Sequence, residues 1–243
     1  MDWFSGREVF CTELFCKRFL WFAPVSMSLG RLVGGSPMPA CSYCGRSVAK
    51  TEREHVFPSN LYPPSRAGSI VQRLTIPACR ECNGSWSDDE AHFRNVLALS
   101  GDNPNSPRRE LWQGLIKRSL DEPDAAKRID DLLALMRPVV VKGAERHMIY
   151  PAEDDRILRV IRKIIRGLAY YHQLFQFVPD DKVWVDVQRY LIPDQLMRGM
   201  TYHHREADIA EYWYEIIEDR QFHSVWLLRF FEAPSFVGTI HAY

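Results

Sequence analysis

The clearest hydrophobic pattern in the chain runs from Asp155 to Phe175, where apolar residues recur at steps of three and four. An α-helix places such positions on one face, so this segment is predicted to be an amphipathic helix. The apolar face consists of Ile157, Leu158, Ile161, Ile164, Ile165 and Leu168. Basic residues recur at similar steps on another face, namely Arg156, Arg159, Lys163 and Arg166. This basic stripe is interpreted either as the solvated face of the helix or as a surface that contacts phosphates.

Three other helices are predicted earlier in the chain. Ser87 with Glu90 three residues later matches a capping box ahead of an apolar face, and Gly101 supplies a stop signal. Ser106-Pro107 matches a cap followed by a first-turn proline. The third helix is expected from about Asp124 to Met136.

Strand signals gather near the C-terminus. Residues 212–217, 224–231 and 236–241 are rich in aromatic and β-branched residues and are separated by turn-like breaks. Such segments are typical of antiparallel strands. A β-hairpin is also predicted between Cys41 and Cys82, around Glu54-His55. The predicted fold class is therefore α+β.

Composition sets limits on the partners of the chain. The 243 residues contain 31 Lys and Arg against 31 Asp and Glu, and 46% are hydrophobic. A packed core is therefore expected, and a strong overall field that would draw in a polyanion is excluded. Contact with nucleic acid would depend on a local basic excess between Cys41 and Asn83, which includes Arg53 and Arg80.

Residues 1–37 are predicted to be an N-terminal extension and linker that need not be ordered. Gly34-Gly35-Ser36-Pro37 closes it with turn and breaker residues. A basic pair, Lys17-Arg18, precedes a short apolar run that is too short and too aromatic for a membrane span. No membrane association is expected.

Four cysteines form two pairs with metal-ligand spacing, Cys41 with Cys44 and Cys79 with Cys82. Thiolates presented two residues apart bind zinc tetrahedrally, and the metal itself closes the loop between the pairs. We therefore predict a structural zinc site made by all four. Thiols kept free for zinc indicate a reducing compartment, so a cytoplasmic location is expected.

Between the two pairs lies Glu54-His55-Val56-Phe57-Pro58, and Asn83 directly follows Cys82. The order of these motifs resembles the zinc-knuckle branch of the HNH endonucleases, whose fold is the ββα-metal finger. The resemblance covers about residues 39 to 100. It implies an HNH module at 38–101, followed at 102–243 by a helical region and a C-terminal sheet domain of unknown role.

The resemblance implies a bacterial or phage nuclease that hydrolyses nucleic-acid phosphodiester bonds, with DNA favoured over RNA. His55 corresponds to the general base of the family, and Glu54 and Asn83 correspond to ligands of a catalytic Mg²⁺ or Mn²⁺. The chain departs from the family at the central asparagine, which orients the base and should lie between His55 and Cys79. The one asparagine in that interval, Asn60, lies close behind the histidine, and Gln72 or a backbone carbonyl is the alternative for this role. The residues predicted to contact nucleic acid are Arg53, Arg80, Arg159, Lys163 and Arg166.

Two other functions are compatible with the same residues. In the first, His55 only stabilises the hairpin and the module is a non-catalytic zinc finger that binds nucleic acid. In the second, the C-terminal aromatic strands form a docking face for another protein. His92 is placed where it could face the metal, but it is interpreted as a solvated residue on a helix surface. The pair His203-His204 is interpreted as surface, because no partner with ligand spacing accompanies it.

Overall fold

The structure is a computed structural model that describes residues 38–100, 105–123, 125–141, 143–149, 154–189, 192–217 and 221–241. The predicted N-terminal extension, residues 1–37, lies outside the described residues. The chain from Met38 onward forms one compact unit. The regions predicted on either side of residue 101 therefore pack together within that unit.

The fold is α+β, as predicted. The helices are α1 (Arg80–Gly84), α2 (Ser87–Leu99), α3 (Ser106–Leu111), α4 (Lys117–Leu120), α5 (Ala126–Ala134), α6 (Asp155–Tyr171) and α7 (Asp194–Gly199). A π-helical turn joins α3 to α4, and short 3-10 turns occupy Ser59–Leu61, Pro64–Arg66 and Asp180–Lys182. None of the helices in the described part of the chain has the length and apolar character needed to cross a bilayer.

All strands pair antiparallel. They are β1 (Glu52–His55), β2 (Thr75–Ala78), β3 (Met136–Val141), β4 (Ala144–Ile149), β5 (Val183–Val187), β6 (Thr201–Glu206), β7 (Ala210–Ile216), β8 (Phe222–Phe230) and β9 (Ser235–His241). β1 and β2 form the predicted hairpin, and β3 and β4 form a second one. The remaining strands form a sheet in the order β5-β9-β8-β7-β6, which contains the three strands predicted near the C-terminus.

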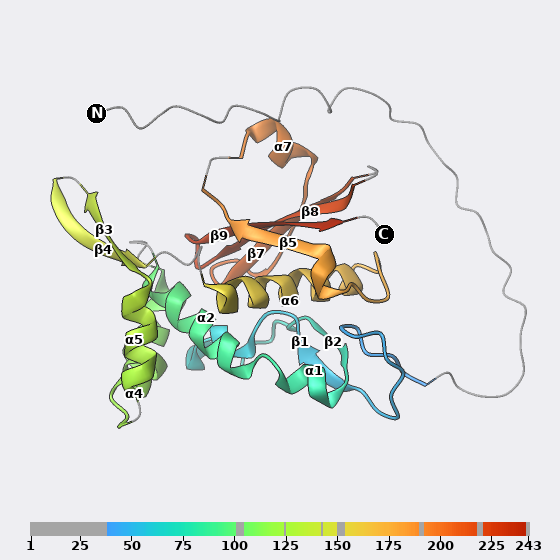
Figure 1. Ribbon diagram of the computed structural model, residues 1–243, viewed down its shortest axis with the longest axis horizontal. Coiled ribbons are helices and arrows are strands. Elements are labelled where there is room, and N and C mark those ends of the chain that lie inside the picture. Colours follow the sequence, from blue (N-terminus) through green and yellow to red (C-terminus); the bar gives the residue numbers. More distant parts are fainter. Residues whose placement is uncertain are drawn as a thin grey trace, which may run out of the picture. The chain divides into compact units, whose positions relative to one another are not determined.

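Helix α6 is the central layer of the molecule. The five-stranded sheet lies on one side of it, and the β1-β2 hairpin and α2 lie on the other (Figure 1). Gly238 of β9 faces Ile165, while Gly167 lies so close to the hairpin that an added Cβ would sit 3.0 Å from the Tyr43 hydroxyl. Both sides of α6 are covered, so its buried residues include polar positions outside the apolar face predicted from the sequence, such as Lys163 and Arg166.

The main core joins aromatic side chains from α2, from the sheet and from the segment that follows β1. Phe93 of α2 meets Phe230 of β8 edge to face, with ring centroids 5.3 Å apart, and Phe230 lies 5.9 Å from Phe236 of β9. Phe57, directly after the hairpin strand β1, packs against Phe230 and Tyr212 of the sheet. These contacts hold the hairpin, α2 and the sheet in one core.

Two predicted helix caps are wrong. The N-cap of α2 is Trp86, and Ser87 is already helical, with its hydroxyl 3.5 Å from the Gly84 carbonyl. The N-cap of α3 is Asn105, whose side chain accepts a hydrogen bond from the Arg108 amide. In both cases the chain enters the helix one residue away from the expected position, and the helices themselves are confirmed.

Candidate metal centre and histidine site

The four cysteines predicted to bind zinc come together. Their sulfur atoms all lie within 4.8 Å of one another, and Cys44 Sγ is 4.0 Å from Cys79 Sγ. Cys41 and Cys79 are buried, whereas Cys44 and Cys82 are partly exposed. A compact set of four thiols drawn from two CxxC turns fits a tetrahedral zinc ion.

Each pair sits on a tight local turn. In the first, Gly45 adopts a φ of +69°, and its amide donates to the Cys41 carbonyl. A side chain there would also meet the ring of Phe177. In the second, Cys79 is the N-cap of α1 and its sulfur accepts from the Cys82 amide. Backbone donors to sulfur are typical of thiolates that bind a metal and need their charge compensated.

Arg46 is the cation of this centre. Its Nε donates to Cys44 Sγ at 3.3 Å, its Nη2 lies 3.9 Å from Cys79 Sγ, and it also pairs with Glu81. Burial alone raises the pKa of Cys44, but the hydrogen bonds from Arg46 outweigh it and lower that pKa to about 6. The Cys44 thiol is therefore ready to lose its proton at neutral pH, as zinc binding requires.

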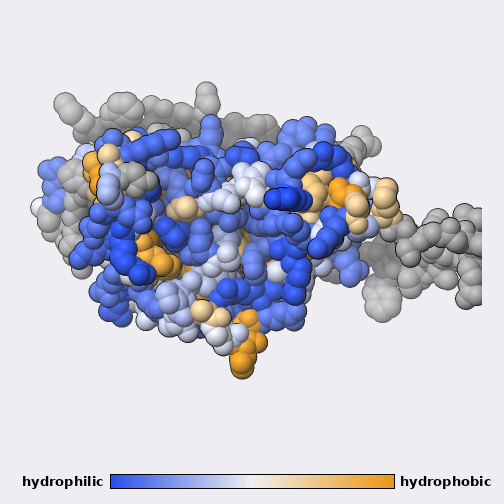
Figure 2. Space-filling view, turned by 90° about the horizontal axis from the view of Figure 1, so that it is seen from below, coloured by the Kyte–Doolittle hydropathy of each residue, from blue (hydrophilic) through white to orange (hydrophobic). Residues whose placement is uncertain are grey.

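His55 lies on the outer face of the hairpin, opposite Thr75 in the strand register. Arg53, two residues earlier on the same face, donates to the Thr75 hydroxyl at 3.2 and 3.3 Å. Arg73 lies close enough to act on the charge of His55, and its guanidinium stacks on Tyr62 at 4.0 Å. Seen from below in the orientation of Figure 1, the surface on the side of the hairpin is mostly hydrophilic (Figure 2).

The imidazole of His55 is held in its neutral form. Burial lowers its pKa, and the positive charges of Arg73, Lys163 and Arg53 lower it further. The Nδ1 atom is shielded from solvent and has no hydrogen-bond partner among the described residues. A neutral imidazole beside two arginines is suited to take a proton near a negatively charged group.

Glu54 points the opposite way, into the interior. Its Oε1 accepts from the ammonium of Lys163 at 2.6 Å, and Lys163 also donates to Glu90 Oε1 at 2.6 Å and to the His55 carbonyl at 2.7 Å. The Lys163 side chain is fully buried. Its three N–H groups thus have three acceptors, and one ammonium joins β1, α2 and α6.

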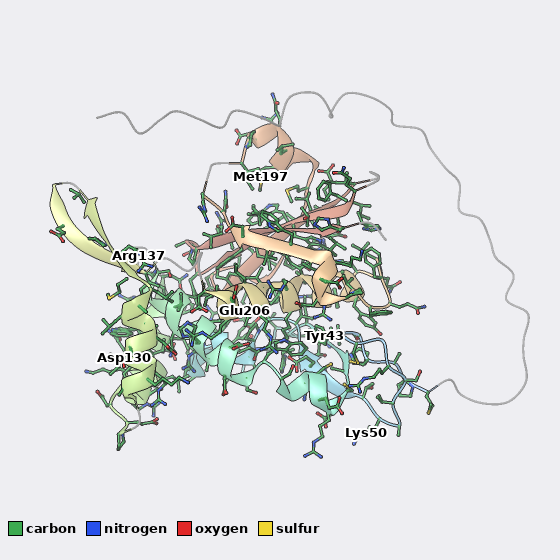
Figure 3. The ribbon with its side chains drawn as sticks, in the orientation of Figure 1. Tyr43, Lys50, Asp130, Arg137, Met197 and Glu206 are labelled. Atoms are coloured by element: carbon green, nitrogen blue, oxygen red, sulfur yellow. The ribbon has the colours of Figure 1, made fainter. Side chains whose placement is uncertain are left out.

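The basic stripe of α6 therefore has a different role from the predicted one. Lys163 is bound to two carboxylates, and Arg166 is buried with its guanidinium bonded to the Tyr43 and Val178 carbonyls and to Asp180. Tyr43 lies where the hairpin region meets α6 (Figure 3). Because α6 is covered on both sides, these two side chains face the hairpin region instead of solvent, and in this structure they are bonded inside the molecule.

The other predicted phosphate contacts remain on the surface. Arg53 and Arg80 are exposed. Arg159 is partly exposed and pairs with Asp89 at 2.7 Å. Of these, only Arg53 shares a strand and a face with His55.

The predicted ligands of a catalytic metal do not converge. Asn83 donates to Glu52 at 2.7 Å, whereas Glu54 is bound to Lys163. A Mg²⁺ or Mn²⁺ ion needs several oxygen ligands around one point, and an ammonium already occupies the position between Glu54 and Glu90. The residues carried over by the resemblance therefore do not fit a divalent metal at this site.

Two histidines interpreted as surface residues have partners inside the molecule. His92 is buried, and its Nε2 lies 2.8 Å from Asp154, the N-cap of α6. The ring of His203 stacks on Tyr212 at 5.2 Å, while His204 is exposed. His203 alternates with His204 along β6, so one side chain faces α6 and the other faces away.

Several residues that shape the site were not found from the sequence. Arg73 was counted only as part of the local basic excess, and Glu90 was interpreted as a capping residue. A signal for Lys163 did exist, because it lies between Val160 and Gly167 at helical spacing. A lysine placed so close to an apolar face is buried only if carboxylates accompany it.

Comparisons with protein families, with curated proteins and with solved structures gave no match to this chain.

Proposed function

We propose that this protein is an endonuclease of the HNH type that hydrolyses a nucleic-acid phosphodiester bond, preferably in DNA, with His55 as general base. The observation that carries the proposal is the position of His55, whose neutral imidazole lies on the outer face of a hairpin beside Arg53 and Arg73. The order of hairpin, cysteine turns and α2 also agrees with the ββα-metal arrangement that the sequence motifs resemble.

The chemistry follows from these side chains. His55 would take a proton from a water molecule as the water oxygen forms a bond to phosphorus and the bond to the departing sugar oxygen breaks. The guanidiniums would offset the negative charge that grows on the phosphate oxygens. Lys163 is buried too deeply to touch the phosphate, and it positions His55 by holding the His55 carbonyl.

The zinc would act on structure and not on the reaction. Its four thiolate ligands leave no open position for water or substrate. No step is assigned to Mg²⁺ or Mn²⁺, because Glu54 and Asn83 are engaged elsewhere.

The test is His55→Ala in a plasmid-nicking assay. Losing a positioned general base should slow cleavage by about two to four orders of magnitude. Zinc content and melting temperature should stay the same, since His55 is neither a zinc ligand nor a core residue. The matched control is His204→Ala, an exposed histidine on β6 that should cleave like the parent.

Cleavage by His55→Ala at the parental rate would overturn the proposal. Nucleic-acid binding by a parent that cleaves nothing, with or without added Mg²⁺ or Mn²⁺, would instead favour the non-catalytic zinc finger. The ion pair of Glu54 with Lys163 is the observation that favours this second function, because it ties the predicted metal ligand into the interior.

A further inference from the structure

A hollow of about 610 Å³ opens beside the hairpin, on the side of β2 away from β1. Its walls come from Thr75 and Ile76 of β2, the end of α6 at Tyr170 and Tyr171, and the segment that follows α6 from Gln173 to Gln176. None of these wall residues carries a charge at neutral pH. The hollow therefore suits a neutral ligand with both flat apolar faces and polar edges.

The hollow adjoins the His55 site. Thr75 forms part of its wall and is also the residue opposite His55 in the β1-β2 register. Adjacent strands lie about 4.8 Å apart. Arg53 donates to the hydroxyl of the same threonine. A ligand in the hollow would thus lie next to the position where a phosphate would meet Arg53 and His55.

The edge of β2 that faces away from β1 offers backbone groups of Thr75 to the hollow. In an antiparallel pair, successive residues direct their N–H and C=O groups alternately toward the partner strand and away from it. The carbonyl of Pro77 points away from β1, because it accepts from Ser42. Thr75, two residues earlier, presents its backbone donor and acceptor to that same edge.

Gln173 is held in an unfavourable backbone conformation at the rim. Its φ is +59°, in the left-handed region that glycine usually occupies at the end of a helix. A residue with a Cβ is disfavoured there, and strain of this kind gathers at functional positions. Within the described part of the chain, neither Gln173 nor Gln176 has a hydrogen-bond partner for its side-chain amide, so both amides are available to a ligand.

We propose that this hollow binds one unstacked nucleobase of a single-stranded nucleic acid, next to the phosphate cleaved at His55. Aromatic side chains such as Tyr171 and Phe175 provide stacking surfaces, and glutamine amides pair with the donor and acceptor edge of a base. A base inside a duplex does not reach such a hollow unless it is flipped out. The protein therefore prefers single strands, or sites with an unpaired base. The part of this inference that concerns cleavage rests on the proposed function.

The first experiment measures binding without cleavage. The full chain carrying His55→Ala is titrated with a single-stranded oligonucleotide that contains one 2-aminopurine, and with the same sequence as a duplex. Stacking in the hollow should change the fluorescence of the single strand, and the single strand should bind about 5- to 150-fold more tightly than the duplex, the range expected for one base-stacking contact. Equal affinity for both forms would overturn the inference.

The second experiment uses Gln173→Gly, which removes the amide and also relieves the left-handed backbone. The melting temperature of this variant should be no lower than that of its parent, so misfolding would not explain weaker binding. It should bind the single strand several-fold more weakly, as should Phe175→Leu. The control Gln113→Ala removes an exposed glutamine from another part of the surface and should bind like the parent. Parental binding by both hollow variants would overturn the inference.

Two further comparisons test whether the hollow binds a small nucleotide instead, and whether the binding result depends on the nuclease proposal. A free nucleoside monophosphate that competes as strongly as the oligonucleotide would assign the hollow to a small nucleotide and contradict the inference. The binding result is also independent of the nuclease proposal. If His55→Ala cleaves normally while Gln173→Gly loses single-strand binding, the proposed base is wrong and the nucleobase site stands. If the reverse holds, the nuclease stands and the nucleobase site fails.

Discussion

The hairpin region at residues 38–84 and the C-terminal sheet are stabilised in different ways. The two strands of the hairpin have four residues each, and a two-stranded hairpin alone is marginal in water. The sheet has five strands, of which β8 has nine residues, and its inner face buries Trp226, Phe230 and Phe236 completely. The hairpin region adds four clustered cysteines and two buried cations from α6 to its apolar contacts, whereas the sheet relies on apolar area.

This difference decides how each region responds to change. Apolar area is spread over many contacts, so one substitution removes a part of it. A metal site or a buried ammonium is a single interaction whose loss leaves several charged groups without partners. The residues proposed for function therefore lie in the region that contains these single strong interactions. Substitutions placed in either region test this contrast.

Cys79→Ser should have the largest effect. It removes a thiolate from the centre, and structural zinc contributes about 10–16 kcal/mol in small finger peptides. Zinc content should fall toward zero and the hairpin should unfold locally, as measured by metal analysis and by hydrogen exchange of β1 and β2. The matched control Ser85→Ala, an exposed position after α1, should keep its zinc. One zinc per chain and an unchanged melting curve in Cys79→Ser would show that the four cysteines are not the ligands.

Lys163→Met should have the next largest effect. The change leaves the carboxylates of Glu54 and Glu90 buried without their cation, and breaking a buried ion pair costs about 3–5 kcal/mol. The comparison is Arg159→Met on the same helix, where the pair with Asp89 is partly exposed and its loss should cost less than about 1 kcal/mol. Urea denaturation measures both.

A double variant sharpens this prediction. Adding Glu54→Gln to Lys163→Met removes one of the two stranded charges and should recover part of the lost free energy of unfolding. Equal losses in Lys163→Met and Arg159→Met would mean that the ammonium is not buried and that the basic stripe is a solvated face after all.

The sequence predicted those features that depend on local spacing. The four cysteines came together as expected, because a CxxC turn fixes its two sulfurs within a few residues. The hairpin, α2, α6 and the last three strands also follow local periodicity or composition. Strands β3, β4, β5 and β6 were not predicted. β6 reads Thr-Tyr-His-His-Arg-Glu and lies at an edge of the sheet, so most of its side chains stay polar.

Features that depend on how distant segments of the chain pack against each other could not be predicted from local spacing. Lys163, Arg166 and Arg159 have nearly the same spacing along α6, yet the first two are buried and the third is partly exposed. The difference arises because the hairpin region covers α6 along one side, a contact between residues more than 100 positions apart. For the same reason the sequence could not reveal that Glu54 is bound to a lysine.

Gly238→Ala probes the sheet and should have a smaller effect. A methyl group there would overlap Ile165 of α6 and lie 3.0 Å from the Trp184 carbonyl. Overpacking of this kind costs about 1–3 kcal/mol. Zinc content should not change, because the strain falls on the layer opposite the hairpin. The control is Gly68→Ala, where nothing lies within 4 Å of the added methyl, and which should change stability by less than about 0.5 kcal/mol. Zinc loss in Gly238→Ala would show that the two regions do not respond separately.

The smallest expected effect is a pH dependence in the sheet layer. Burial, with a contribution from the neighbouring His203, lowers the pKa of His172 to about 4. Its Nε2 also lies 2.9 Å from the Tyr212 hydroxyl, and its ring lies against Tyr214. Between pH 6.5 and about 4 the unfolded chain therefore binds a proton at this residue that the folded chain does not bind, so stability falls as the pH falls through this window.

His172→Phe removes that proton from both states. Its free energy of unfolding should therefore decline less between pH 7 and pH 5 than that of the parent, as measured by urea denaturation at each pH. His55, His92 and His203 also have lowered pKa values and remain in the variant, so the slope is reduced and not abolished. His204→Phe, an exposed position on β6, should keep the parental slope. A parental slope in His172→Phe would show that His172 does not cause the acid sensitivity and would assign it to other groups, such as His55, His92 and His203.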